Sequence, residues 1–265
     1  MKKEEAKDIL KLIRDNIETP VPEVTKTGLA ITALTGGIEA LDHDVEKEQA
    51  VRRYFQLMQE RPEEFQNTGL INIEKNIDKF MVAAQVLNKP VGVVYESNYH
   101  IMVVDICLGK DGYYTYERII PKARGNAVAI LPEYEGKVIL LKQYRHALRD
   151  WQYAIPRGFA NDRLSEKDNA IKNVVEKTGC TVSNITCLGT TVADSGLSGT
   201  KVAVYHAKCS EPDFKYGTGN ATQLVMMSLG ELRGMIRDGK VTDGFTMTAL
   251  MMYMAAKDAE CCQGS

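Results

Sequence analysis

The sequence has few residues that could hold a transition metal and no excess of charge of either sign. It contains six cysteines and four histidines. No two cysteines form a CxxC pair, and no histidine stands near a cysteine at the spacing of a zinc site. The formal net charge is -2, which argues against binding of nucleic acid through bulk electrostatics. A zinc-binding domain and a nucleic-acid partner are therefore both disfavoured.

Long apolar runs are also missing. No stretch approaches the ~18 apolar residues that a membrane-spanning helix needs. The N-terminal segment MKKEEAKDILKLIRDNIE lacks the apolar centre and the small-residue cleavage site of a signal peptide. The remaining composition, 44% hydrophobic and 26% charged, is typical of a globular protein with a sizeable core. We therefore expect a cytoplasmic protein that has no membrane partner.

The cysteines fall into two groups. Four lie in apolar stretches, where a reduced thiol behaves as a small hydrophobic side chain: Cys107, Cys180, Cys187 and Cys209. We interpret these four as structural. The adjacent Cys261 and Cys262 belong to a short tail, residues 261–265, and we interpret them as exposed residues for which the sequence indicates no role.

The first part of the chain, residues 1–88, has the pattern of a helical extension. Apolar residues recur with helical spacing in AKDILKLIRDNI, VEKEQAVRRYFQLMQE and INIEKNIDKFMVAAQVL, and Pro62 ends the second of these segments. The Gly36–Gly37 turn between the first two lacks the lysine of a phosphate-binding loop. The sequence therefore predicts helices here, without indicating what they do.

After Pro90 the pattern changes to strands. Apolar stretches around a KDG turn and around EYEGK predict two sets of paired strands. A helix is expected over Glu166–Lys177, followed by three more strands and a helical region that ends near residue 258. We therefore expect a second domain over residues 89–260, of α+β class.

One segment of this domain, GFANDRLSEKDNAIKNVVEKTGC over residues 158–180, resembles the Nudix box. The family pattern is G-x5-E-x7-R-E-U-x-E-E-x-G-U, where U is a bulky aliphatic residue. The positions that match are Gly158, Val174, Glu176 and Gly179. The positions that depart from it are Leu164, Lys172, Asn173 and Lys177, of which all but Lys172 stand where the family has glutamate.

The flanks of the box extend the resemblance. GNAVAILPEYEGKVILLKQYRHALRDWQYAIPRGF is similar to the segment that precedes the box in ADP-ribose pyrophosphatases and related Nudix proteins. LGTTVADSGLSGTKVAVYHA and MIRDGKVTDGFTMTAL are similar to their later strands and last helix. Over roughly residues 90–258 the resemblance implies an α-β-α sandwich with a mixed sheet. It also implies a nucleotide or nucleotide-sugar ligand and a homodimer.

The departures bear on catalysis. Nudix hydrolysis of a pyrophosphate uses Mg or Mn, which prefer carboxylate oxygens, and the family's box glutamates correspond here to Asn173, Glu176 and Lys177. An ammonium about 4 Å from a divalent ion costs several kcal/mol at an effective dielectric of ~20. Glu176 is then the remaining candidate metal ligand and catalytic carboxylate. We expect hydrolysis to be lost or strongly reduced.

Lys177 suggests a different use of the same position. Its ammonium could neutralise a pyrophosphate directly, with Arg145 and Arg157 adding phosphate contacts and Tyr144 and Trp151 offering aromatic surface to a base. Each of these residues can also be explained without a ligand. The lysine is then a solvated surface residue, the arginines are ion-pair partners, and the aromatic rings are packed in the core. Gly158 and Gly179 are explained as turn and helix-end glycines whatever the function.

Three functions therefore stay open. The first is an ADP-ribose-type binding protein without metal catalysis. The second is a divergent pyrophosphatase with a relocated metal site that uses Asp162, Glu166 or Asp168. The third is a structural or interaction module that has no ligand.

Overall fold

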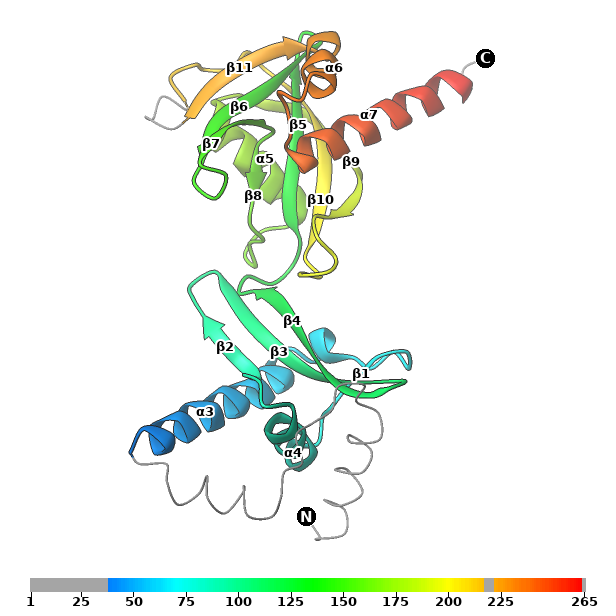
Figure 1. Ribbon diagram of the computed structural model, residues 1–265. Coiled ribbons are helices and arrows are strands. Elements are labelled where there is room, and N and C mark those ends of the chain that lie inside the picture. The colour runs from blue at the N-terminus through cyan, green and yellow to red at the C-terminus, as the bar shows by residue number, and fades with distance from the viewer. Residues whose placement is uncertain (1–37, 217–221, 264–265) are drawn as a thin grey trace. The chain divides into compact units, whose positions relative to one another are not determined.

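The chain forms two compact units, residues 1–122 and 123–265. The computed structural model describes residues 38–216 and 222–263 (Figure 1), so the expected first helix and the Gly36–Gly37 turn lie outside the described residues. The division falls after Lys122 and not near residue 88, because the strands that follow Pro90 pair among themselves and pack against the preceding helices.

The described part of the first unit combines three helical segments with a small antiparallel sheet. Strand β3 is central, and it pairs with β1, β2 and β4. The expected helix before Pro62 is confirmed, and the third expected helix starts later than its apolar pattern, at the Asn76 cap. The elements are α3 Ile38–Glu60, η1 Pro62–Phe65, β1 Asn72–Ile73, α4 Ile77–Leu87, β2 Gly92–Glu96, β3 His100–Gly109 and β4 Gly112–Pro121.

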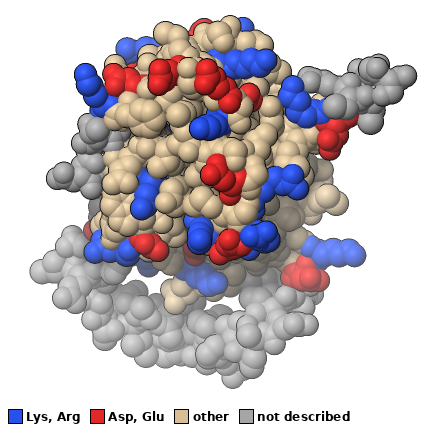
Figure 2. Space-filling model, turned by 90° about the horizontal axis from the view of Figure 1, so that it is seen from above, with Lys and Arg blue, Asp and Glu red and all other residues tan. Residues whose placement is uncertain are grey.

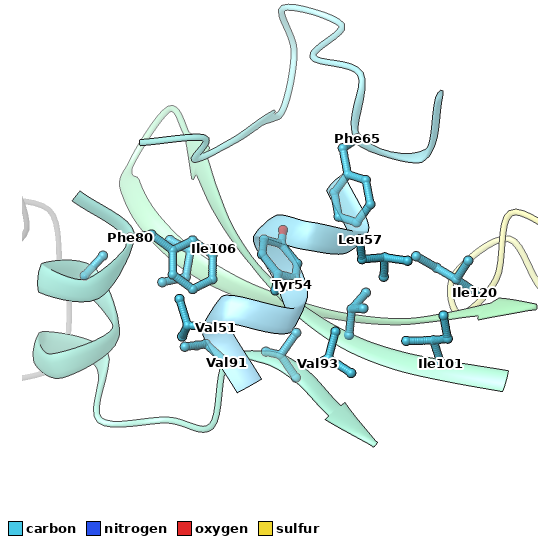
Figure 3. Close-up of a cluster of buried hydrophobic side chains, with 13 residues drawn as sticks. Val51, Tyr54, Leu57, Phe65, Phe80, Val91, Val93, Ile101, Ile106 and Ile120 are labelled. Atoms are coloured by element: carbon cyan, nitrogen blue, oxygen red, sulfur yellow. The ribbon is translucent and has the colours of Figure 1, made fainter. Parts of the chain in front are cut away.

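The core of the first unit lies between α3, α4 and the sheet (Figure 3). The ring of Tyr54 is fully buried, and it meets Phe65 and Phe80 at centroid distances of 5.3 Å and 5.0 Å. Aromatic rings of this size supply much of the burial energy of a small core. The hydroxyl of Tyr54 donates to a carboxylate within this core, that of Asp105, at 2.5 Å.

The second unit is built on a seven-stranded mixed sheet in the order β11-β6-β5-β10-β9, with β7 paired to β6 and β8 paired to β5. Strands β5 and β10 run parallel, and the other pairs are antiparallel. The strands are β5 Ala127–Tyr134, β6 Lys137–Arg145, β7 Asp150–Ala154, β8 Arg157–Gly158, β9 Val182–Val192, β10 Lys201–Cys209 and β11 Thr222–Ser228.

Helices cover both faces of this sheet. Side chains alternate along a strand, so in β5 Val128 and Ile130 pack with α5 Glu166–Thr178, whereas Ala129 and Leu131 pack with α6 Leu229–Arg237 and α7 Gly244–Gln263. The expected α-β-α sandwich with a mixed sheet is therefore confirmed. Within the described ranges, no helix is both long and apolar enough to cross a bilayer.

Candidate functional site

Helix α5 carries the box residues, and its two ends are fixed by the sequence. At its start the Ser165 hydroxyl accepts from the backbone N–H of Asp168 at 3.1 Å, a typical N-cap. At its end Gly179 adopts a φ of +69°. A Cβ on this residue would lie 2.7 Å from a ring carbon of Tyr216 and 2.8 Å from Cβ of Asp213. Conformation and space both require glycine here.

Gly158 places strand β8 directly against α5. A Cβ at Gly158 would lie 2.1 Å from Nδ2 and 2.5 Å from Oδ1 of Asn173. Asn173 itself is buried, with 7% of its surface exposed. The glycine therefore makes room for the amide that replaces a glutamate of the family pattern.

The polar side chains of α5 form a hydrogen-bonded series that we call the amide ladder: Asn169, Asn173 and Lys177. Asn173 Nδ2 donates to the carbonyl and side-chain oxygens of Asn169 at 2.9 Å and 3.0 Å. Lys177 Nζ donates to Asn173 Oδ1.

The amide ladder joins α5 to the chain beside it. Asn169 Nδ2 donates to the carbonyl of Phe159 at 2.9 Å, and Lys177 Nζ donates to the carbonyl of Arg157. An ammonium has three donors, and these two contacts of Lys177, to Asn173 and Arg157, use two of them. The described residues provide no hydrogen-bond acceptor for the third N–H of Lys177.

Arg145 and Arg157 lie close enough to Lys177 to act on its charge, and we call these three residues the cation cluster. Burial lowers the pKa of Lys177. The carboxylate of Glu176 opposes this shift, and the two arginines add to it. Burial also lowers the pKa of Arg145, with a further contribution from Arg157. Arg145 Nε is buried and has no hydrogen-bond partner among the described residues.

A buried carboxylate, that of Asp243, lies beside the two arginines of the cation cluster. Its Oδ1 lies 3.3 Å from Nη1 of Arg157, and it is only 4% exposed. Its other oxygen caps α7, accepting from the backbone N–H and the hydroxyl of Thr246 at 3.0 Å and 2.7 Å. Thr246 in turn accepts from the N–H of Ile155, shortly before β8. The sequence reasoning missed Asp243, although an Asp three residues before a Thr at a helix start is a capping signature.

The predicted aromatic residues lie elsewhere. Tyr144 and Trp151 face each other across β6 and β7 with ring centroids 6.0 Å apart, and Lys142 Nζ lies 5.6 Å from the Trp151 ring. Tyr144 and Arg145 are adjacent in β6, so their side chains point to opposite faces of the sheet. The three cations Arg145, Arg157 and Lys177 are close enough to interact electrostatically, whereas Tyr144 lies on the face of β6 opposite to Arg145.

The carboxylates considered as metal ligands are scattered. Glu176 is exposed and pairs with Lys172 at 3.7 Å. Glu166 accepts from Asn126, Asp168 accepts from the Ser165 hydroxyl at 2.6 Å, and Asp162 is exposed. In the described part of the chain, no three His, Cys, Asp or Glu side chains gather as a metal site. The residues at the box therefore do not fit Mg or Mn, which need several oxygen ligands.

Comparisons with known proteins bear on the fold. No protein-family profile matches the chain, and no curated protein does. Among solved structures, an ADP compounds hydrolase is similar, with a TM-score of 0.55, 17% sequence identity, and coverage of 63% of this chain and 91% of the hydrolase chain. The fold is Nudix-like. At this identity the similarity extends to the fold alone, and the second unit, which carries the box, is called the Nudix-like unit below.

Proposed function

We propose that the Nudix-like unit binds an anionic nucleotide derivative of the ADP-ribose type, and that metal-dependent hydrolysis of its pyrophosphate is lost or strongly reduced. The observation that carries this proposal is the cation cluster. Two of its three cations, Arg145 and Arg157, interact with the buried carboxylate of Asp243, and Lys177 interacts with the exposed carboxylate of Glu176. Lys177 stands at a position where the family pattern has a glutamate, and the resemblance implies that Arg145 and Arg157 are near the substrate pocket.

The electrostatics of the cation cluster favour an anionic ligand. Buried cations without partners cost free energy, and a diphosphate supplies both negative charge and acceptor oxygens. The guanidinium of Arg145 and the third donor of Lys177 are the groups that would donate to phosphate oxygens in this proposal. The solved hydrolase with the same fold acts, by its description, on ADP compounds, which makes ADP-ribose a reasonable first probe.

The amide ladder supports the absence of metal chemistry in this proposal. Lys177 donates to Asn173 and to the β8 carbonyl of Arg157, and an ammonium repels a divalent ion. The chain's own residues would then bind and orient the pyrophosphate while supplying no carboxylate pair to activate water. Tyr144 and Trp151 remain a predicted contact for a base, and the homodimer also remains a prediction.

The test is calorimetric titration of the full chain with ADP-ribose, first with Mg and then with EDTA, followed by analysis of the recovered ligand. We expect binding that EDTA does not change and ligand that is intact. Lys177→Met, which keeps the apolar stem, should weaken binding roughly 10–100-fold. Lys172→Met is the matched control, because Lys172 is an exposed lysine on the same helix. Thermal melting of both variants separates loss of binding from loss of folding.

Three other outcomes would favour one of the two other functions. Cleavage that needs Mg and disappears in Glu176→Gln would establish the divergent pyrophosphatase. Cleavage that persists in Glu176→Gln would point to a relocated site around Glu166. Absence of binding under both conditions, with a normal melting curve, would leave the structural or interaction module.

A further inference from the structure

Asp243 holds a buried acid at the edge of the cation cluster. It is the one buried carboxylate among the described residues of the Nudix-like unit. A carboxylate that is out of water needs a charged partner and hydrogen bonds. Asp243 has both, because Oδ1 lies 3.3 Å from Arg157 Nη1 and the second oxygen accepts two hydrogen bonds from Thr246. The carboxylate is therefore fixed in place.

The same turn of α7 also fixes the guanidinium of Arg157. The guanidinium carbon lies 4.9 Å from the centre of the Phe245 ring, so this side chain has a carboxylate at one edge and an aromatic ring at one face. The backbone just before Arg157 is tied to the same turn, since the N–H of Ile155 donates to Thr246 Oγ1 at 3.0 Å. The direction of the Arg157 side chain is therefore set by residues at the start of α7.

The acid reduces the positive charge that the cation cluster can offer to a ligand. The cluster contains three cations, and Asp243 is the buried acid beside its two arginines. The other nearby carboxylate, that of Glu176, is exposed and pairs with Lys172, so water screens its charge and a lysine outside the cluster balances it. Asp243 thus cancels one of the three positive charges, and two remain for a ligand.

Nucleotide ligands with a diphosphate differ in charge according to how the diphosphate ends. A diphosphate that is esterified at both ends, as in ADP-ribose, carries one negative charge on each phosphate near neutral pH. A nucleotide that ends in a free phosphate, such as ADP, has a further ionisable oxygen whose pKa is about 6, and so carries about three charges. The third charge has no cation left to oppose it, and it is repelled by the carboxylate of Asp243.

We infer that Asp243 is a specificity-determining residue, which makes the cation cluster select a diphosphate esterified at both ends over a nucleotide with a free terminal phosphate. It cancels one positive charge of the cluster, and it holds Arg157 in the direction in which a ligand meets it. The inference rests on the proposed function, because it concerns the ligand of the same cluster.

The experiment is calorimetric titration of the full chain, in EDTA, with three ligands: ADP-ribose, ADP and the methyl ester of the terminal phosphate of ADP. ADP and its ester differ only in the methyl group and the charge that it removes, so the ratio of their dissociation constants reports that charge. EDTA removes divalent ions, which would neutralise it. We expect the unmodified chain to bind both the ester and ADP-ribose roughly tenfold more tightly than ADP.

Asp243→Asn should bring the ratio for ADP and its ester close to one, because the amide keeps an oxygen for Thr246 and removes the charge. A purely structural role of Asp243 would weaken binding of both ligands alike and leave the ratio unchanged. The matched control is Asp258→Asn, because Asp258 is an exposed acid on the same helix, and it should keep the ratio of the unmodified chain. If thermal melting shows that Asp243→Asn does not fold, Asp243→Ser removes the same charge and retains a capping oxygen.

Two results would overturn the inference alone: equal affinity of the unmodified chain for ADP and its ester, or a ratio that neither substitution of Asp243 changes. Both leave the proposed function intact as long as ADP-ribose binds. If none of the three ligands binds to a chain with a normal melting curve, the proposed function fails and the inference fails with it.

Discussion

The two units treat buried charge in opposite ways. In the first unit Asp105, 2% exposed, accepts from Arg118 Nε at 2.6 Å and from Tyr54 at 2.5 Å. Arg118 also lies 3.8 Å from Glu64 and 4.7 Å above the Phe65 ring. In the Nudix-like unit, by contrast, the three cations Arg145, Arg157 and Lys177 have near them one buried carboxylate, Asp243, and one exposed carboxylate, Glu176. Charge is balanced in the first unit and unbalanced in the second.

The difference separates a structural role from a binding role. A buried ion pair whose members are satisfied within the protein holds elements together, and removing one member leaves an uncompensated charge. Here the pair joins β3 to β4, with Tyr54 of α3 completing it. A cation that is desolvated without a partner lowers stability, so its retention is better explained by a ligand that supplies the missing charge. Substitutions in the two regions should therefore have opposite effects on stability.

The largest effect is expected for Asp105→Asn. This change preserves shape but leaves Arg118 buried and opposed only by the more distant Glu64, and we expect it to lower the free energy of unfolding by about 3–5 kcal/mol. Urea unfolding followed by circular dichroism measures the loss. The chain has one tryptophan, Trp151 of the second unit, so its fluorescence reports the Nudix-like unit separately. The urea midpoint detected by fluorescence should shift less than the midpoint detected by circular dichroism.

The matched control for this prediction is Glu63→Gln. Glu63 is an exposed acid in the same turn as Glu64, and its loss should change stability by less than ~0.5 kcal/mol. If Asp105→Asn is as stable as Glu63→Gln, the charge balance of the first unit is not what holds it together.

Arg145→Met should act in the other direction on stability. Removing the buried Nε–H of Arg145, which has no hydrogen-bond partner among the described residues, relieves its burial cost, and we expect the Nudix-like unit to gain up to about 1 kcal/mol. Affinity for ADP-ribose should fall roughly tenfold or more, because a phosphate contact is lost. Tryptophan-detected unfolding and calorimetry measure the two quantities on the same sample. A variant that is less stable and binds normally would assign Arg145 a structural role and remove the contrast between the units.

Local patterns predicted part of this fold well. The helix before Pro62, the strands around KDG and the box helix all have clear periodicity or turn signals, and all three are present. The position of the boundary between the two units could not be predicted from local patterns. Strands β2–β4 could pack with the earlier helices or with the later sheet, and contacts between residues distant in sequence decide which. The change in pattern at Pro90 marks the start of three consecutive strands, β2, β3 and β4, and the fold divides after the last of them.

The candidate site shows the same limit. Resemblance to the Nudix box led to Arg157, Asn173 and Lys177, and the structure places all three in contact. Asp243 lies far along the chain and carried only a capping signal, so its approach to Arg157 could not be foreseen. The alternation that sends Tyr144 away from Arg145 was readable from the strand pattern.

The smallest effect concerns pH, and it tests Lys177 alone. Burial places the pKa of Lys177 below its ordinary value of 10.5. Between the lowered pKa and 10.5 the unfolded chain binds more protons than the folded one, so the free energy of unfolding should rise with pH in this window. Binding of a diphosphate requires the ammonium, so affinity for ADP-ribose should fall severalfold over the same window.

Lys177→Arg is the informative variant for this prediction, since a guanidinium stays charged throughout the range. The affinity of this variant for ADP-ribose should stay constant over the pH range in which the affinity of the unmodified chain declines. The affinity of Lys172→Met should decline as that of the unmodified chain does. Calorimetry at a series of pH values up to 10.5 compares the three proteins. Equal declines in all three would mean that the titrating group lies outside the cation cluster. The amide ladder would then be a purely structural replacement for the metal, satisfied within the protein as Asp105 and Arg118 are in the first unit.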